Sequence, residues 1–172
     1  GGSLLGFLPE EALFCMSDGL YRGTEDGYER VALDGTPVYD MIPYEDDSWF
    51  AATSDGLSYV ERTAGGFETA SLATDFSGSI ERMMIVCGKI YIGTFSGLYI
   101  YNIGGHSLKR VDSVPDVSIC GFARSGSREL IVASDGGGIY VLDASTGKLM
   151  RQYYETGRNR TGLLSNSVAD MC

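Results

Sequence analysis

Short apolar runs alternate along this chain with polar turns that contain glycine. The clearest example is the segment K-I-Y-I-G-T-F-S-G-L-Y-I-Y-N at residues 89–102. Its two apolar runs, residues 90–92 and 98–101, are β-branched and aromatic, a composition that favours strands. The residues between them, from Gly93 to Gly97, are typical of a tight turn, so the segment predicts a β-hairpin.

The same hairpin pattern recurs at residues 12–21, 49–59 and 130–140. A glycine precedes the second run of each copy, at steps of 37, 41 and 41 residues: Gly19, Gly56, Gly97 and Gly138. One position before the turn holds only small residues: Cys15, Ala52, Gly93 and Ala133. In the last copy one extra residue separates the small residue from the glycine, which we interpret as a longer turn within an intact repeat.

Further strands are predicted on both sides of each hairpin. An apolar run precedes each copy, at residues 4–8, 38–42, 80–86 and 117–122. A more polar run follows each copy, at residues 28–33, 67–72, 108–111 and 148–154. Four strands in roughly 40 residues, repeated along a chain, are typical of β-propeller blades. Leucine-rich repeats would show an asparagine ladder, and a β-helix would have shorter coils.

The predicted fold is therefore all-β, a single β-propeller region over residues 1–172 with four consecutive four-stranded antiparallel blades. The blades are expected at residues 3–33, 36–72, 79–112 and 117–155. The small-residue position has a physical reason, because a bulky side chain where blades crowd would hold neighbouring sheets apart. The glycines suit turn positions that require a positive φ.

The last residues predict the start of a further blade, at residues 163–172, with Val168 and Met171 in apolar register. The first blade already has its own first strand, so we expect the chain to be a fragment of a larger propeller. A propeller cut before closure exposes the faces of its end blades, and large exposed apolar patches are rare on monomers. We therefore expect the fragment to self-associate, and Ile90, Ile92, Ile131 and Tyr140 are the apolar candidates for such faces.

The composition argues against some classes of function. The net charge of −10, from 13 basic and 23 acidic residues, argues against nucleic-acid binding, which requires a basic surface. No apolar run reaches the roughly 20 residues that span a bilayer. The chain begins at Gly1 without a methionine or a signal peptide, so we expect a mature or trimmed fragment.

Metal and cofactor chemistry is not expected. The four cysteines show no C-x-x-C pair and no metal-type spacing, and Cys15 and Cys120 lie in apolar runs where they suit buried positions. The single histidine, His106, lies in a glycine-rich turn. It cannot build a histidine metal cluster, and we expect no catalytic role for it.

Two segments resemble the two-component regulator propeller repeat. Gly162-Leu163, Asn166-Ser167-Val168 and Met171 match the first half of that repeat, and residues 90–94, Gly97-Leu98 and Tyr101 match the second half. Blade one departs from the pattern, with Cys15-Met16 where Gly-Thr is usual. The resemblance implies the periplasmic sensor region of a membrane-bound hybrid histidine kinase. Such regions are followed by a β-sandwich, a membrane helix and the kinase, and many respond to glycan breakdown products.

The turns and blade-to-blade connections at one end of the propeller are the predicted ligand site. Asp18, Asp55 and Asp135 could accept hydrogen bonds from sugar hydroxyls, and Phe95 or Trp49 could face a sugar ring. Arg158 and Arg160 could clamp a carboxylate or sulfate, and Asn166 ends the same connection. Each aspartate of an S-D-G turn also suits the turn itself, and Trp49, which opens a strand, suits the core.

Two other functions remain open from the sequence. A propeller-fold lyase or glycosidase would need catalytic carboxylates at a defined separation, and the many aspartates do not exclude one. A protein-binding propeller scaffold of the WD-repeat kind lacks its G-H…W-D signature here. We expect an oligosaccharide-sensing region without catalysis of its own and without cofactors. Its partners would be the ligand and the rest of the propeller and receptor, with membrane attachment only through segments that are not present.

Overall fold

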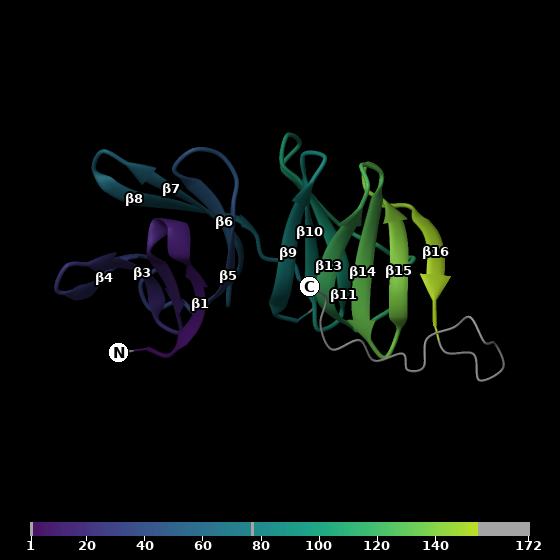
Figure 1. Ribbon diagram of the computed structural model, residues 1–172, viewed down its shortest axis with the longest axis horizontal. Helices are drawn as coiled ribbons and strands as arrows, with labels where there is room; N and C mark the ends of the chain where they lie inside the picture. Colours follow the sequence, from purple (N-terminus) through teal and green to yellow (C-terminus); the bar gives the residue numbers. More distant parts are fainter. Residues whose placement is uncertain (1, 77, 155–172) are drawn as a thin grey trace. The chain divides into compact units, whose positions relative to one another are not determined.

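The computed structural model describes residues 2–76 and 78–154, and Figure 1 shows its ribbon in sequence colours. The described residues form four antiparallel sheets of four strands each, with the strands of each sheet adjacent in chain order. This confirms the predicted fold class. The predicted further blade and the candidates Arg158, Arg160 and Asn166 lie outside the described residues.

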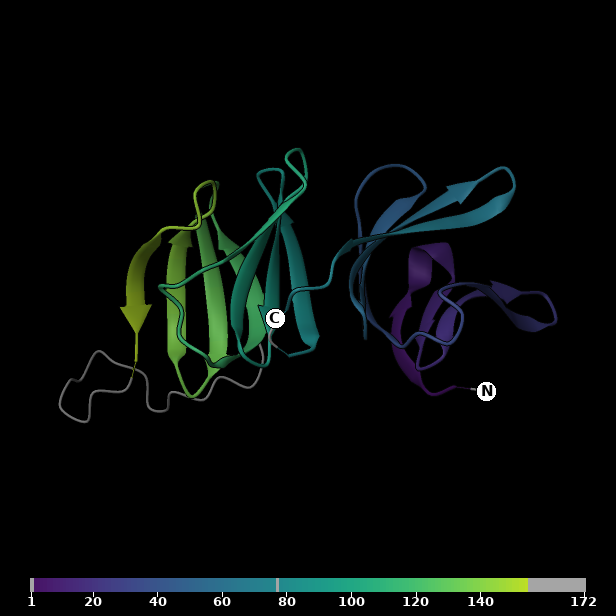
Figure 2. The same ribbon diagram turned by 180° about the vertical axis from the view of Figure 1, so that it is seen from behind.

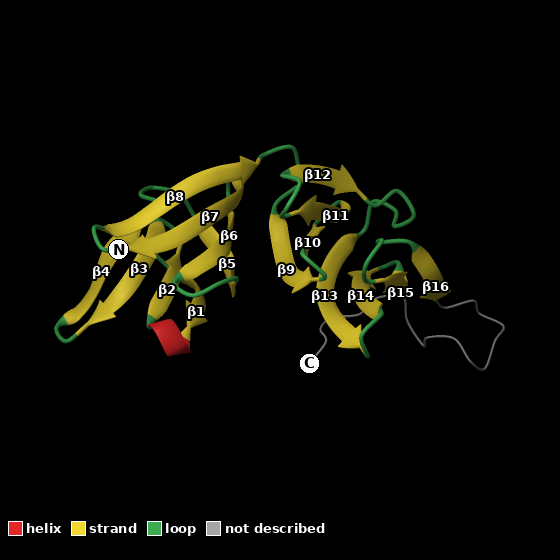
Figure 3. Ribbon diagram, turned by 90° about the horizontal axis from the view of Figure 1, so that it is seen from above, coloured by secondary structure: helices red, strands yellow, loops and turns green. Residues whose placement is uncertain are grey.

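The first sheet contains β1 (Leu4–Leu8), β2 (Leu13–Met16), β3 (Gly19–Thr24) and β4 (Gly27–Ala32). The second contains β5 (Val38–Pro43), β6 (Ser48–Thr53), β7 (Gly56–Thr63) and β8 (Gly66–Ala73). The third contains β9 (Ile80–Val86), β10 (Lys89–Thr94), β11 (Gly97–Asn102) and β12 (Ser107–Arg110). The fourth contains β13 (Ser118–Ser125), β14 (Glu129–Asp135), β15 (Gly138–Asp143) and β16 (Leu149–Tyr153). Among the described residues the one helix is the short 3-10 turn η1 (Pro9–Glu11), drawn in red in Figure 3.

The chain divides into two compact units, residues 1–80 and residues from 81 onward. In the first unit the two sheets share a core. The first sheet contributes Leu13, Cys15 and Leu20, which pack with residues of the second sheet that include Trp49 and Ala51. Trp49 is only 2% exposed, so it is a core residue and not a ligand platform.

The second unit, seen from behind in Figure 2, is built in the same way. Its core joins Tyr91 and Leu98 of the third sheet to Ile119, Val132 and Leu142 of the fourth. The Tyr91 hydroxyl donates a hydrogen bond to the Ala144 carbonyl at 3.1 Å. The bond connects β10 in the middle of the third sheet to the end of β15 in the fourth. It also gives the hydroxyl of the fully buried Tyr91 a hydrogen-bond partner.

The small-residue position is buried in every sheet, where it holds Cys15, Ala52, Gly93 and Ala133. A Cβ on Gly93 would lie 2.6 Å from Ile119 Cγ2, closer than two carbon atoms can approach. The predicted reason for small residues at this position is therefore confirmed within the second unit.

The repeated glycines open the third strand of every sheet with a positive φ: 145° at Gly19, 120° at Gly56, 124° at Gly97 and 81° at Gly138. A Cβ on Gly56 would also collide with the Ala73 carbonyl oxygen of the outer strand. The equivalence of these turns is confirmed. The extra residue in the last copy lengthens the turn, since Ser134 pairs with Gly138 and Ala133 with Ile139.

The prediction of which apolar residues lie on exposed faces is mostly wrong. Ile90 and Ile92 are fully buried, and Tyr140 is 1% exposed. Only Ile131 is partly accessible. Exposed apolar side chains gather instead in the first sheet, where Phe7 is 48% exposed. The hydropathy pattern identifies apolar positions, but it does not show which face of a sheet a neighbour covers.

Candidate functional site

In the first three sheets the hairpin turn between the second and third strands lies beside the connection that follows the fourth strand. In the first sheet the Gly35 amide donates to the Asp18 carbonyl at 3.0 Å. In the third sheet the Val111 amide donates to the Leu98 carbonyl at 2.9 Å. The predicted grouping of turn and connection therefore exists in the separate sheets of both units.

Hydroxyl side chains hold three of these turns in shape. Thr53, Thr94 and Ser134 each donate to the carbonyl of the turn glycine, at 2.9, 3.1 and 2.8 Å. Thr53 and Thr94 also accept a bond from a turn amide, that of Asp55 at 3.2 Å and that of Ser96 at 3.1 Å. These hydroxyls stabilise the turn itself, because every bond that they make is local.

In the first sheet the turn is held differently, since Met16 replaces the hydroxyl residue. The Tyr21 hydroxyl donates to Asp18 Oδ2 at 3.1 Å. Burial raises the pKa of Tyr21, and the hydrogen bond and charge of Asp18 add to the effect. The other carboxylate oxygen of Asp18 is buried without a hydrogen-bond partner. Asp18 therefore keeps one unused acceptor, which is unusual for a buried polar atom.

The other predicted residues are more accessible. Asp55 is exposed and accepts a bond from the Ser54 hydroxyl at 3.1 Å. Asp135 is also exposed, and Phe95 has 57% of its surface exposed. Asp18 and Asp55 occupy corresponding turns of the first unit, and Phe95 and Asp135 occupy corresponding turns of the second.

A small cavity of about 70 Å³ adjoins the turn of the second sheet. Thr53, Asp55 and Phe76 are among its lining residues, so it lies between the turn and the connection that follows β8. Ligand sites for small molecules usually measure about 300–1,000 Å³. This cavity alone has room for a part of a ligand, such as one hydroxyl group, but not for a sugar ring.

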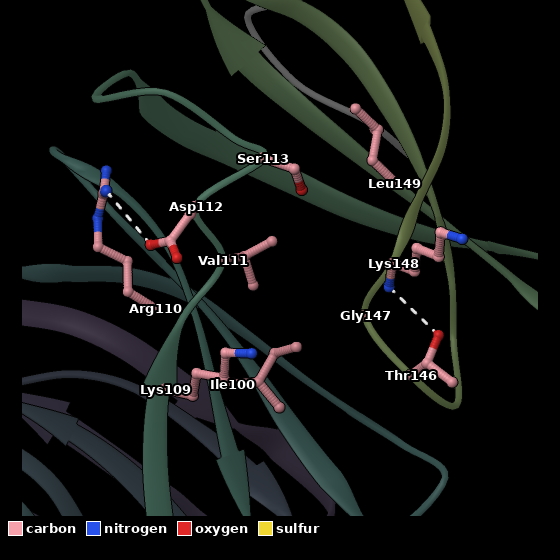
Figure 4. A pocket seen from close by; sticks show the side chains of 10 residues that line it. All are labelled: Ile100, Lys109, Arg110, Val111, Asp112, Ser113, Thr146, Gly147, Lys148 and Leu149. Carbon is pink, nitrogen blue, oxygen red and sulfur yellow. Dashed lines mark hydrogen bonds and ion pairs between the residues drawn. The ribbon is translucent and has the colours of Figure 1, made fainter.

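A larger groove of about 510 Å³ opens in the second unit, and the sequence did not indicate it. Figure 4 shows that its lining comes from three segments: Ile100 of β11, the end of β12 with the residues that follow, and the turn between β15 and β16 with the first residue of β16. Ile100, Val111 and Leu149 give it an apolar floor. No local motif could have revealed the groove, because these segments meet only when the third and fourth sheets pack together.

Cationic side chains surround this groove. Arg110 is neutralised by ion pairs with Asp116 and, at 4.0 Å, with Asp112. Lys109 and Lys148 are exposed and make no ion pair within the described part of the chain. Exposed lysines of this kind are ordinary on a soluble protein, so the groove is a secondary candidate for binding.

A second groove, of about 600 Å³, lies in the first unit and is lined by acidic residues around Trp49. Arg62 bridges Glu11 at 2.9 Å and Asp47 at 3.0 Å. Its guanidinium lies over Trp49, 5.3 Å from the ring centroid, and over Phe67 at 5.5 Å. Arg62 thus ties η1 to the β5–β6 turn, which is a structural role.

The described residues show no arrangement typical of catalysis by a metal or by histidine. No group of three potential metal ligands occurs among residues 2–76 and 78–154. His106 Nδ1 lies 3.2 Å from the Tyr101 hydroxyl, within one hairpin. No helix in the described ranges is long and apolar enough to cross a membrane.

Comparison with solved structures identifies the fold, whereas the sequence comparisons find no match. No protein-family model matches the chain. No curated protein matches it either. Several solved structures match with high probability although they are less than 25% identical to this chain in sequence.

Two of these structures are extracellular domains of proteins from B. thetaiotaomicron. The extracellular domain of the putative hybrid two component system BT4673 matches with a TM-score of 0.69 and 22% identity over 92% of this chain and 23% of that chain. The extracellular domain of the putative hybrid two component system BT3049 matches with a TM-score of 0.65 and 16% identity over 91% of this chain and 22% of that chain. The chain thus spans less than a quarter of the length of these two solved chains.

A third structure shows the same fold in another role. PorZ, a bacterial surface component of the type-IX secretion system of Porphyromonas gingivalis, matches with a TM-score of 0.65 and 14% identity over 92% of this chain and 27% of that chain. One fold can support many functions. The comparisons therefore show the propeller fold alone, which occurs in extracellular domains of two-component systems and in a secretion-system component.

Proposed function

We propose that this chain is part of the extracytoplasmic sensor region of a two-component signalling receptor. The observation that carries the proposal is the repeated turn, which presents an exposed side chain on a rigid, hydrogen-bonded base in successive sheets. Similarity to the extracellular domains of two hybrid two-component systems supports the same role. In a bacterium with two membranes such a region lies in the periplasm, and its partners are the rest of the propeller and the receptor chain.

The ligand class that we propose is an oligosaccharide. Asp55 and Asp135 provide exposed carboxylates that can accept bonds from sugar hydroxyls, and Phe95 provides an exposed ring that can stack on the apolar face of a sugar. In the second unit, exposed carboxylate and aromatic side chains at corresponding turns suit recognition of a neutral, hydroxyl-rich molecule.

We propose further that the chain has no catalytic activity of its own. The predicted aspartates occur at repeated turn positions, and the side-chain hydrogen bonds of Asp18 and Asp55 serve those turns. A glycosidase would instead hold one pair of carboxylates at a defined separation across the bond that it cleaves. Any kinase activity belongs to other parts of such a receptor.

Isothermal titration of the purified chain with a panel of neutral and acidic oligosaccharides tests this function. At least one oligosaccharide should bind, and Phe95→Ala and Asp135→Asn, both in the second unit, should each weaken binding by roughly tenfold, the effect of losing about 1.4 kcal/mol. Asp26→Asn is the matched control, because Asp26 is exposed in the turn between β3 and β4 of the first sheet. Absence of binding across the panel, or equal losses in the control, would contradict the proposal.

Product analysis of the same mixtures tests the second part. The oligosaccharides should be recovered intact after long incubation. Cleavage that disappears when one aspartate or glutamate is replaced would instead assign the chain to the propeller-fold lyases or glycosidases.

A further inference from the structure

The groove of about 510 Å³ in the second unit lies between two walls, which Figure 4 shows from close by. One wall is the end of β12 with the residues that follow it, and the other is the β15–β16 turn. The floor between them is apolar: Ile100 and Val111 are 9% and 7% exposed, and Leu149 is partly buried. The volume falls within the roughly 300–1,000 Å³ of known ligand sites.

Hydrogen bonds hold the β15–β16 wall in place. Asp143 Oδ1 accepts bonds from the Ser145 and Thr146 amides, at 3.1 and 2.8 Å, and from their hydroxyls, at 2.7 and 2.8 Å. Gly147 lies directly against the floor, because a Cβ at this position would collide with Ile100 Cδ1. A wall that is formed in advance loses little conformational entropy when a ligand binds.

The opposite wall is also fixed. The Val111 amide donates to the Leu98 carbonyl at 2.9 Å, and the Val111 carbonyl accepts a bond from the Val114 amide at 3.0 Å. Val114 is fully buried, so the backbone after β12 is anchored in the core of the second unit. An ion pair with Asp116 restrains Arg110. Both walls therefore exist before a ligand binds.

The groove is positively charged although the chain carries a net charge of −10. Among the described residues, four charged side chains line it: Lys109, Arg110 and Lys148 are cationic, and Asp112 is acidic. Arg110 is neutralised, which leaves one lysine on each wall with no ion pair to residues 2–76 and 78–154. Acidic groups elsewhere oppose this charge weakly, because the screening length is about 8 Å at physiological ionic strength. The groove should therefore attract a negatively charged ligand.

The shape of the groove favours an extended peptide over a compact small molecule. Small ligands are usually buried over roughly 70–90% of their surface. Here the floor is a strip between two walls, and its residues are largely covered by their own sheets. An extended chain suits such a strip, because alternate side chains point the same way. Nucleic acid is a poor match, since its phosphate backbone requires more than two free cationic side chains.

We propose that the groove binds an acidic peptide segment of a partner protein in an extended conformation. An apolar side chain of the peptide packs on Val111 and Leu149, and carboxylates on either side of it pair with Lys109 and Lys148. The proposal goes beyond the sensing function, because none of the turn residues proposed to bind the oligosaccharide lines the groove. Two exposed ion pairs and one apolar side chain give a weak and reversible site.

Fluorescence anisotropy with a labelled synthetic peptide tests the proposal. The peptide has a central leucine with two glutamates on each side, and it should bind with a dissociation constant between the micromolar and the millimolar range. Replacing all glutamates with glutamines, or the leucine with serine, should weaken binding by roughly tenfold. A peptide that does not bind, or a glutamine peptide that binds equally well, overturns the proposal.

Substitution of the lysines tests the position of the site. Lys109→Ser and Lys148→Ser should each weaken binding by about two- to fivefold, the range of an exposed ion pair. Arg124→Ser is the matched control, because Arg124 is exposed on β13 and its loss changes the net charge equally. All three positions are exposed, so the fold should tolerate the changes, which circular dichroism checks. An equal loss in the control assigns the effect to net charge and overturns the site.

Nuclear magnetic resonance identifies the occupant. The backbone amide signals of Lys109, Val111, Gly147 and Lys148 should shift when the acidic peptide is added. Octanoate, a small carboxylate with an apolar tail, should not displace the peptide at the same concentration. Shifts confined to other surfaces overturn the site, and octanoate that binds in the groove in place of the peptide overturns the peptide as its occupant.

Discussion

Gly93 in β10 lies so close to Ile119 in β13 that a Cβ at position 93 would stand 2.6 Å from Ile119 Cγ2. Replacing Gly93 with alanine should therefore force the third and fourth sheets apart. Overpacking of this kind costs about 1–3 kcal/mol. The free energy of unfolding, measured by denaturant titration, should fall by that amount.

A double-mutant cycle separates this contact from a local effect on the strand. Ile119→Ala removes the atoms that the new Cβ would meet, so Gly93→Ala should cost much less in the Ile119→Ala background. Gly65→Ala is the control, since nothing but the Thr63 hydroxyl at 3.9 Å approaches that position. Equal costs of Gly93→Ala in both backgrounds would show that the two sheets do not meet here.

Thr94 illustrates how the repeated turns are stabilised. Its buried hydroxyl donates to the Gly97 carbonyl at 3.1 Å and accepts from the Ser96 amide at 3.1 Å. Thr94→Val should lower the free energy of unfolding by about 1–3 kcal/mol, because the buried Gly97 carbonyl and the part-buried Ser96 amide lose their partner. Thr94→Ser keeps the hydroxyl and should cost less; a similar loss in both variants would show that packing, not hydrogen bonding, is the function of this position.

The cysteines should differ sharply in reactivity. Burial, with a smaller contribution from the negative charge of Asp40, raises the pKa of Cys15 to about 12. Cys87 is exposed on a turn. Brief alkylation at neutral pH followed by peptide mapping should therefore modify Cys87 and leave Cys15 intact until the protein is unfolded. Early labelling of Cys15 would contradict its place in the core between the first two sheets.

Asp143 should make stability depend on acidic pH. Hydrogen bonds from Ser145 and Thr146 lower its pKa below the usual 3.8, so the folded state binds its proton less readily than the unfolded state. The resulting stabilisation is present above pH 3.8 and is lost as pH falls toward the folded-state pKa. The melting temperature of Asp143→Asn should fall less steeply below that pH than that of the wild type. The control Asp26→Asn should keep the wild-type slope, and a control that flattens equally would assign the effect to net charge.

The strands could be predicted from sequence because their signals are local. The predicted runs at 4–8 and 80–86 coincide with β1 and β9, since an apolar run bounded by glycine or proline turns defines both ends. The turn glycines were also predictable, because a positive φ restricts the residue type at the position itself. The longer turn before Gly138 could be predicted from the number of residues between Ala133 and Gly138.

Burial and grooves could not be predicted in this way. Ile90 and Ile92 belong to an alternating strand, and nothing within that strand shows which face another sheet covers. The groove beside Lys109 and Lys148 joins segments almost 40 residues apart, and it forms only when two sheets pack. The buried oxygen of Asp18 is likewise a property of the packed turn, whereas its S-D-G sequence predicts only a turn.

Ligand mapping by nuclear magnetic resonance tests the sensing proposal most directly. Each sheet has turns at both ends of its strands, so the chain carries its own internal control. On addition of a binding oligosaccharide, the backbone amide signals of the β6–β7 and β10–β11 turns, at Asp55 and Ser96, should shift. Those of the turns at the other end of the same strands, at Gly65 and Gly104, should stay in place. Shifts confined to Gly65 and Gly104, or to the groove around Lys109 and Lys148, would contradict recognition at the repeated turns.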